Sequence, residues 1–278
     1  MKVNKLPYQN DVIKDLHYLI QSEFLIHSHQ GMELLPEFLN DSLKISLGSI
    51  CRDADTDNIT IQELNQAKQL RLGKYCEELW AFYFEKHPDF KVLEKNWQIN
   101  REGITYGEVD FILEHKSVVF GLETSFKCYG QFAEGLEGWE GPKRKDSFIK
   151  KLDKVQSHQL PVFESEEVVG RYGKISAYFY VKGHLFSSDD FTKDSNFKEV
   201  EFDTVGWAEI ALLELKNRSI YLFPKSAWVS EIYFSNKKYE VKSEDLKIKL
   251  NEARAKGQSL ILGIRSKNVF ENYLIVED

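Results

Sequence analysis

The sequence has few cysteines and lacks any long apolar segment. Its three cysteines, Cys51, Cys76 and Cys128, are odd in number and far apart, so we expect reduced thiols rather than a disulfide framework. None has the paired spacing of a zinc site. No apolar run approaches the ~20 residues that span a membrane, and the first residues lack the apolar segment of a signal peptide. These absences predict a cytoplasmic protein that does not enter a membrane.

A basic excess is also missing, because the formal net charge is −7. A coat protein that binds nucleic acid by broad phosphate neutralisation is therefore not expected. A metal-dependent enzyme that needs clustered carboxylates and only local basic residues is compatible with this charge. With 278 residues, 42% hydrophobic and 29% charged, the chain has ordinary globular composition, and we expect one core with appended pieces.

The N-terminal part is expected to be helical with one interruption. Apolar residues such as Val12, Leu16 and Leu19 recur at helical spacing within residues 1–40. Residues 41–59 are rich in Asp and Ser, which predicts a loop or linker.

A second helical stretch is predicted from about Ile61 to Lys86. Thr60 and Glu63 have the spacing of a capping box at its start, and Pro88 follows its end. The stretch is followed by residues of a different character, in which β-branched and aromatic side chains dominate.

Three strands joined by short polar turns are predicted at residues 92–100, 106–114 and 118–127. The segments expected after them are a glycine-rich loop at 130–142, a helix at 143–158, a strand at 174–185, two strands around a turn within 197–223, a helix at 243–256 and short strands within 259–276. This order is typical of an α/β fold with a mixed sheet. It divides the chain into N-terminal helices and a linker at 1–59, a core at 60–190 and a β-rich extension at 191–278.

Carboxylates gather in the middle of the predicted core. Side chains alternate along a strand, so Glu108 and Asp110 share one face, and Glu123 and Lys127 share one face of the next strand. The preceding helix adds Glu77 or its neighbour in sequence. Converging carboxylates suit Mg²⁺ or Mn²⁺, which activate water and stabilise charge on a phosphodiester. The alternative is that these residues are the solvent-facing side of a half-exposed sheet.

The order of these residues resembles the PD-(D/E)XK nuclease superfamily. The resemblance implies a nuclease-like core, a mixed sheet flanked by helices, in which Glu77, Asp110, Glu123 and Lys127 are catalytic. It also implies that Asp110 and Glu123 hold the metal. The chain as a whole is similar to a bacterial family known as domain of unknown function 1853, through stretches that include RLGKYCEELWAFYF, GEVDFIL, GLETSFKCY and LFPKSAWVSE.

The chain departs from the superfamily pattern at the lysine. The usual spacing is E-x-K, but Ser125 stands where the lysine belongs and Lys127 comes two residues later. On one face of a strand, positions i and i+4 are ~13 Å apart. A bulge at 124–126 would bring Lys127 back, a lysine of the following helix would replace it, or catalysis has been lost.

The only clearly basic stretch spans residues 142–159. It predicts a helix that follows the phosphates of a nucleic acid, and the alternative is a solvated helix face. The residues expected to contact substrate are Lys150, Lys151, Lys154 and Gln159. The sequence thus predicts a Mg²⁺-dependent nuclease acting on DNA or RNA. The alternative is an inactive nuclease-like fold that binds nucleic acid or a protein.

Overall fold

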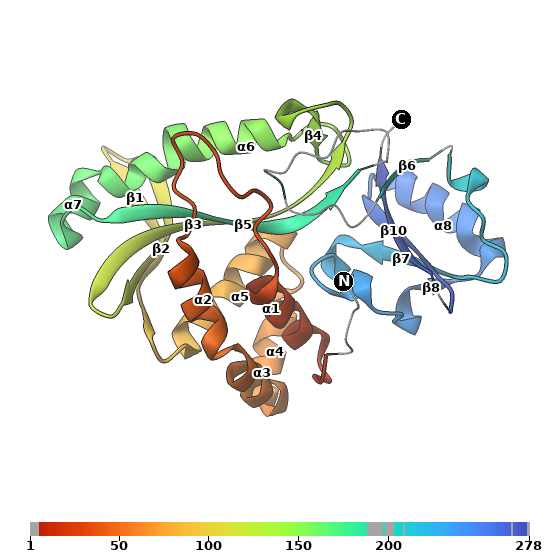
Figure 1. Ribbon diagram of the computed structural model, residues 1–278, viewed down its shortest axis with the longest axis horizontal. Coiled ribbons are helices and arrows are strands. Elements are labelled where there is room, and N and C mark those ends of the chain that lie inside the picture. The colour runs from red at the N-terminus through yellow and green to blue at the C-terminus, as the bar shows by residue number, and fades with distance from the viewer. Residues whose placement is uncertain (1–5, 188–196, 198–202, 208, 268, 277–278) are drawn as a thin grey trace.

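The computed structural model describes residues 6–187, 197, 203–207, 209–267 and 269–276. Two sheets lie side by side along the long axis of the molecule (Figure 1). The strands of the larger sheet are β1 (Phe90–Arg101), β2 (Ile104–His115), β3 (Val118–Gln131), β4 (Trp139–Glu140) and β5 (Ser176–Phe186). Those of the smaller sheet are β6 (Asp203–Gly206), β7 (Ser219–Pro224), β8 (Glu240–Val241), β9 (Leu260–Arg265) and β10 (Phe270–Val276).

Helices cover both faces of the larger sheet (Figure 1). On one side lie α1 (Asp11–Gln21), α2 (Glu37–Ile45), α3 (Leu47–Thr56), α4 (Asn58–Ala67) and α5 (Leu72–Lys86). On the other side lie α6 (Phe148–Lys154) and α7 (Glu166–Tyr172), and α8 (Ser243–Ala255) packs on the smaller sheet. None of the helices within the described residues is long and apolar enough to cross a membrane.

The larger sheet is mixed, as the sequence predicted. β1, β2 and β3 form an antiparallel meander, whereas β5 runs parallel to β3 after the crossover through α6 and α7. The turn between β2 and β3 consists of Lys116 and Ser117, which both have positive φ, as a two-residue hairpin that matches the strand twist requires. These hairpins and the crossover fix which residues of β2 and β3 lie opposite each other.

The two faces of β3 have different partners. Phe120, Leu122 and Phe126 belong to the main hydrophobic core, which includes buried residues of α1 and α5 and continues through 227–233. Gly121 lies on the opposite face, directly under Phe163, where a side chain would collide with the ring. Because side chains alternate, Glu123 faces away from the main core, toward the α6 side.

A buried charged cluster joins the N-terminal helices to the C-terminal part. The Lys68 ammonium lies 2.7 Å from both Asp15 Oδ2 and Glu231 Oε1. Asp15 also accepts hydrogen bonds from the Tyr75 hydroxyl at 2.8 Å and from the Ser230 hydroxyl at 2.6 Å. Burying these charges is tolerable because each one is paired and hydrogen-bonded.

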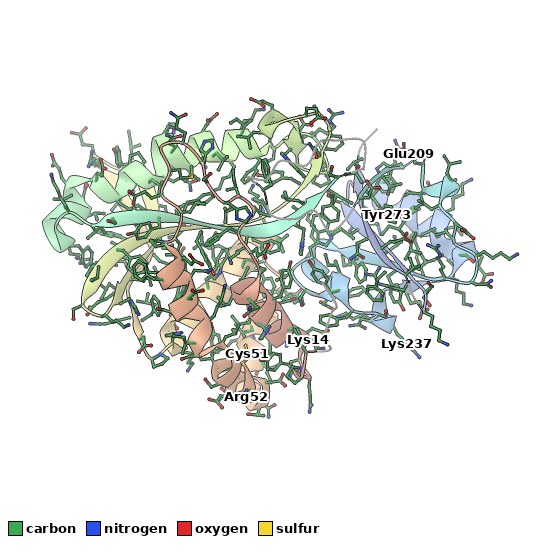
Figure 2. The ribbon with its side chains drawn as sticks, in the orientation of Figure 1. Lys14, Cys51, Arg52, Glu209, Lys237 and Tyr273 are labelled. Atoms are coloured by element: carbon green, nitrogen blue, oxygen red, sulfur yellow. The ribbon has the colours of Figure 1, made fainter. Side chains whose placement is uncertain are left out.

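The structure corrects two predictions about the helical part. Residues 41–59 are helical rather than a linker, and Cys51 lies within this layer (Figure 2). The predicted helix from Ile61 to Lys86 is two helices, α4 and α5, and Asp57 rather than Thr60 caps the first by accepting from the Ile59 N–H.

The strands predicted at 92–100, 106–114, 118–127 and 174–185 are confirmed as β1, β2, β3 and β5, and the helix at 243–256 is confirmed as α8. The first three strands are longer than predicted, and β5 begins two residues later. The helix predicted at 143–158 begins later, at Phe148, and ends in the π-helical turn Val155–Gln159. Part of the predicted segment 197–223 lies outside the described residues, and the described part contains the strands β6 and β7.

Candidate functional site

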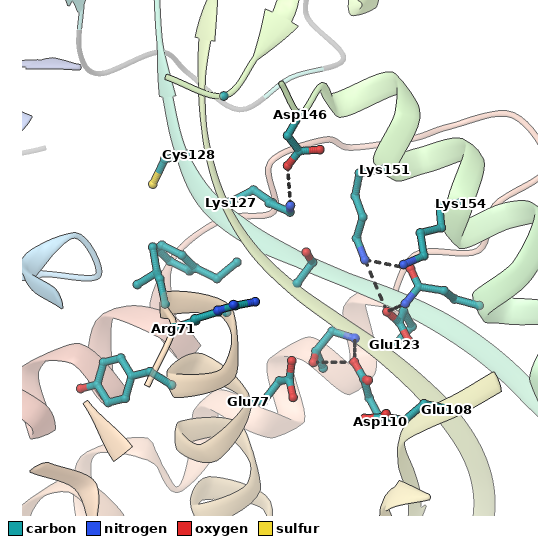
Figure 3. Close-up of a pocket in the computed structure, with 18 of the residues that line it drawn as sticks. Arg71, Glu77, Glu108, Asp110, Glu123, Lys127, Cys128, Asp146, Lys151 and Lys154 are labelled. Carbon is teal, nitrogen blue, oxygen red and sulfur yellow. Dashed lines mark hydrogen bonds and ion pairs between the residues drawn. The ribbon is translucent and has the colours of Figure 1, made fainter. Parts of the chain in front are cut away.

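A cavity of about 1360 Å³ opens beside β3, between α5, α6 and the residues that follow β7 (Figure 3). It is larger than the roughly 300–1,000 Å³ of a typical small-molecule site. Several residues that the sequence predicted for the site line this cavity. Those with a charged side chain close to β3 are Glu77, Asp110, Glu123, Lys127 and Lys151.

Asp110 lies where β2 and β3 separate. The ladder between the two strands ends at the pair Phe111 and Leu122. Just beyond this pair, Asp110 Oδ2 accepts the Thr124 backbone N–H at 2.9 Å and the Thr124 hydroxyl at 3.0 Å. The carboxylate therefore takes the place of a missing ladder acceptor, which holds it rigidly at the opening between the strands.

Glu123 is almost fully buried, with 1% of its surface exposed. Its Oε1 accepts a hydrogen bond from the Gln159 amide and lies 3.4 Å from the Lys151 ammonium. Lys151 also donates to Gln159 Oε1 at 2.9 Å, so the three side chains form a closed triangle. Glu123 Oε2 has no hydrogen-bond partner among the described residues. A buried carboxylate oxygen without a partner is costly, and a proton, a water molecule or a cation can satisfy it.

Asp110 and Glu123 lie in surroundings that oppose the ionisation of both carboxyl groups. Burial, together with the charge of Glu77, raises the pKa of Asp110 to about 6. Burial and the nearby Asp110 carboxylate raise the pKa of Glu123 well above its ordinary value. Burial lowers the pKa of Lys151, although Glu123 and Asp110 counteract it. Excess negative charge at this point favours a cation.

Glu77 completes the acidic side of the cavity and comes from α5. Its carboxylate points toward Asp110 (Figure 3) and pairs with the Lys74 ammonium at 2.7 Å. The sequence left open which of two neighbouring glutamates turns to the sheet. Glu78 pairs instead with Lys95 of β1 at 2.8 Å, so Glu77 is the one directed into the cavity.

The structure brings Lys151, rather than Lys127, to the buried carboxylate. Pairing of β3 with β5 runs without interruption from Phe120 to Gly130, so no bulge shortens the distance from Glu123 to Lys127. Lys127 lines the cavity and pairs with Asp146 at 2.6 Å. Lys151 reaches Glu123 from α6 (Figure 3), which is the second of the arrangements that the sequence left open.

The other predicted contact residues divide into two groups. Gln159 and Lys154 line the cavity, and Gln159 is carried there by the π-helical turn. Turns of this kind are frequent at functional sites. Lys150 is exposed and lies outside the residues that line the cavity, so the structure does not place it at the site.

Three polar residues of the cavity that sequence reasoning missed have a clear place in it. Thr124 holds Asp110, Arg71 lines the cavity from the position just before α5, and Lys225 lines it from the residues after β7. Figure 3 shows the Arg71 guanidinium directed into the space between Glu77 and Lys127. All three lie in the stretches that carry the family resemblance, which is the signal that could have identified them.

The donors present fit a Mg²⁺ or Mn²⁺ ion with an incomplete protein shell. Within the described part of the chain, no three His, Cys, Asp or Glu side chains come together to hold a metal ion by themselves. Mg²⁺ nevertheless usually binds through one or two carboxylates, several waters and substrate phosphate. Asp110 and the partnerless Oε2 of Glu123 are the carboxylate oxygens available for such an ion.

Comparison with known proteins gives one finding. A family model described as domain of unknown function (DUF1853) matches residues 14–271. No curated protein and no solved structure matches the chain significantly.

Proposed function

The chain belongs to the family described as domain of unknown function 1853, and we propose that it hydrolyses phosphodiester bonds of DNA or RNA with the help of Mg²⁺ or Mn²⁺. The α/β core would then be a PD-(D/E)XK nuclease core. We place the activity in the bacterial cytoplasm, where reducing conditions suit the three buried cysteines.

The observation that carries this proposal is the environment of Glu123. Its carboxylate is buried beside Asp110, is held on one oxygen by Lys151 and Gln159, and keeps the other oxygen without a partner. A structural ion pair would satisfy both oxygens, because an unsatisfied buried group costs about 1–3 kcal/mol. The arrangement fits a site completed by a cation.

Each side chain has a defined task in the proposed site. Asp110 and Glu123 would hold the ion, and Thr124 fixes the orientation of Asp110 through two hydrogen bonds. When bound there, the ion would supply positive charge to a phosphoryl oxygen and would make water more acidic. Lys151 takes the role of the superfamily lysine, where its compact ammonium orients the attacking water or contacts the phosphate. Gln159 braces both Lys151 and Glu123.

A cleavage assay tests the proposal. End-labelled single- and double-stranded DNA and RNA are incubated with the protein and Mg²⁺ or Mn²⁺, with chelator as the blank. We expect metal-dependent cleavage that Asp110→Asn abolishes. The matched control is Asp153→Asn, because Asp153 is an exposed carboxylate that lines the same cavity without contacting Glu123. Cleavage by Asp110→Asn at the wild-type rate would show that the site is assigned wrongly.

One observation favours a second candidate, a binding module without catalysis. Lys151 and Glu123 already form an ion pair, which compensates part of the buried charge without a metal. Such a module would bind nucleic acid or a protein equally well in chelator and in Mg²⁺. Binding that is independent of metal and of Asp110, with no cleavage of any substrate, would favour this alternative.

A further inference from the structure

Three lysines from separate parts of the chain line the same cavity beyond the acidic residues. Lys127 comes from β3, Lys143 from the loop before α6, and Lys225 from the turn that follows β7. We call these three residues the lysine subsite. They meet where the larger sheet faces the C-terminal part, so the subsite exists only when both parts are in place.

The nearby carboxylates do not neutralise the positive charge of the lysine subsite. Asp146 pairs with Lys127 at 2.6 Å, while Lys143 donates to the neutral Gly257 carbonyl. Lys225 has no acidic partner among the described residues, and its ammonium lies over the Trp228 ring, 5.6 Å from the ring centroid. Three ammonium groups and one carboxylate leave two net positive charges in a chain whose total charge is −7.

The ammonium groups of Lys143 and Lys127 are close enough to act on Lys225. Partial removal from water lowers the pKa of Lys225; nearby Cys128 opposes this shift, and the charges of Lys143 and Lys127 add to it. Like charges that outnumber their counterions destabilise the folded state, so this arrangement favours a bound anion. An anion with two negative charges would neutralise it.

The subsite is separate from the place where the bond would break. The backbone positions of Glu123 and Lys127 are four residues apart on one uninterrupted strand, which corresponds to ~13 Å. The Lys127 ammonium pairs with Asp146, whereas Lys151 is the lysine paired with Glu123. We therefore assign the phosphate at the subsite and the phosphate at Asp110 and Glu123 to different positions of the substrate.

Charge distinguishes the kind of phosphate. An internal phosphodiester of a nucleic acid carries one negative charge. A phosphomonoester carries about −1.5 to −2 near pH 7 and offers three acceptor oxygens. The two net positive charges and three separate donors of the subsite match the monoester, which in a nucleic acid occurs only at a strand end.

We propose that the lysine subsite binds the terminal phosphate of a nucleic-acid strand and so directs the cavity to strand ends. This deepens the proposed function, since end-directed cleavage rests on it. Binding of the terminal phosphate does not require cleavage and can be measured separately.

The test is a binding experiment in chelator at one fixed salt concentration, since affinity for nucleic acid depends on salt. Fluorescent oligonucleotides of one sequence carry a phosphate or a hydroxyl at the 5′ end or at the 3′ end, and binding is followed by anisotropy. We expect one phosphorylated end to bind about tenfold more tightly, as for one added charge-assisted hydrogen bond. Lys225→Gln should remove this preference, and Lys237→Gln, at the outer edge of the C-terminal part (Figure 2), should keep it.

Two outcomes would overturn the inference. Equal affinity of wild-type protein for phosphate and hydroxyl ends would show that the subsite does not recognise a monoester. Binding of a mononucleotide as tight as that of the phosphorylated strand would identify a small phosphate ester, not a strand end, as the ligand. A preference for phosphorylated ends in a protein that cleaves nothing would support the subsite while the proposed function fails.

Discussion

Replacing Asp110 by Asn should stabilise the metal-free protein at neutral pH. Burial raises the pKa of this carboxyl group to about 6, from an ordinary value of 3.8. The folded state therefore holds the proton more tightly than the unfolded state, and stability falls as pH rises from about 4 to about 6. The difference corresponds to a cost of about 3 kcal/mol once the group is ionised.

Asn has the shape of Asp without the charge, and its side-chain oxygen can still accept the Thr124 N–H. Unfolding by denaturant in chelator at pH 4 and pH 8 measures the effect. At pH 8 the variant should exceed wild type by up to about 3 kcal/mol, and at pH 4 by far less. Added Mg²⁺ should stabilise wild type and not the variant, because only a state that binds the ion gains from it.

The reasoning is refuted if Asp110→Asn lowers stability equally at both pH values. That result would mean that the carboxylate is a stabilising acceptor rather than a strained charge. Such strain at a functional site is common, because activity can require a group that the fold disfavours.

Three further predictions concern other parts of the molecule. Lys151→Gln should leave the far-UV circular dichroism unchanged but abolish cleavage. If the variant only binds the nucleic acid more weakly, Lys151 contacts a phosphate and does not take part in cleavage. Glu231→Ala should lower the free energy of unfolding by about 3–5 kcal/mol, because it removes a buried partner of Lys68, and denaturant unfolding measures it. Gly121→Ala should cost about 1–3 kcal/mol because the new methyl group meets Phe163, and a wild-type melting temperature would contradict the packing.

The strands around the site could be predicted from the sequence, but parts of the helical layer could not. β1 to β3 have short polar turns and β-branched residues, which are local signals. Residues 41–59 contain Asp and Ser, which suggested a loop, while the buried Leu43, Leu47 and Cys51 follow helical spacing. Packing of this apolar stripe against α1 outweighed the local preference of the polar residues.

The acidic residues of the site could be predicted because they lie on two adjacent strands. The β2–β3 hairpin determines the positions of Asp110 and Glu123, because it places them next to each other at the end of its ladder. The approach of Lys151 depends on the crossover helix and its π-helical turn, and no local pattern specifies how far that helix lies from the sheet. Lys225 belongs to the C-terminal part, so only the tertiary fold brings it to the cavity.

Calorimetric titration of Mg²⁺ or Mn²⁺ in the presence of a substrate strand tests the central claim most directly. Wild-type protein and the control Asp153→Asn should bind the ion, and both Asp110→Asn and Glu123→Gln should lose that binding. Equal binding by all four proteins, or none by wild type with the strand present, would contradict a metal site at Asp110 and Glu123.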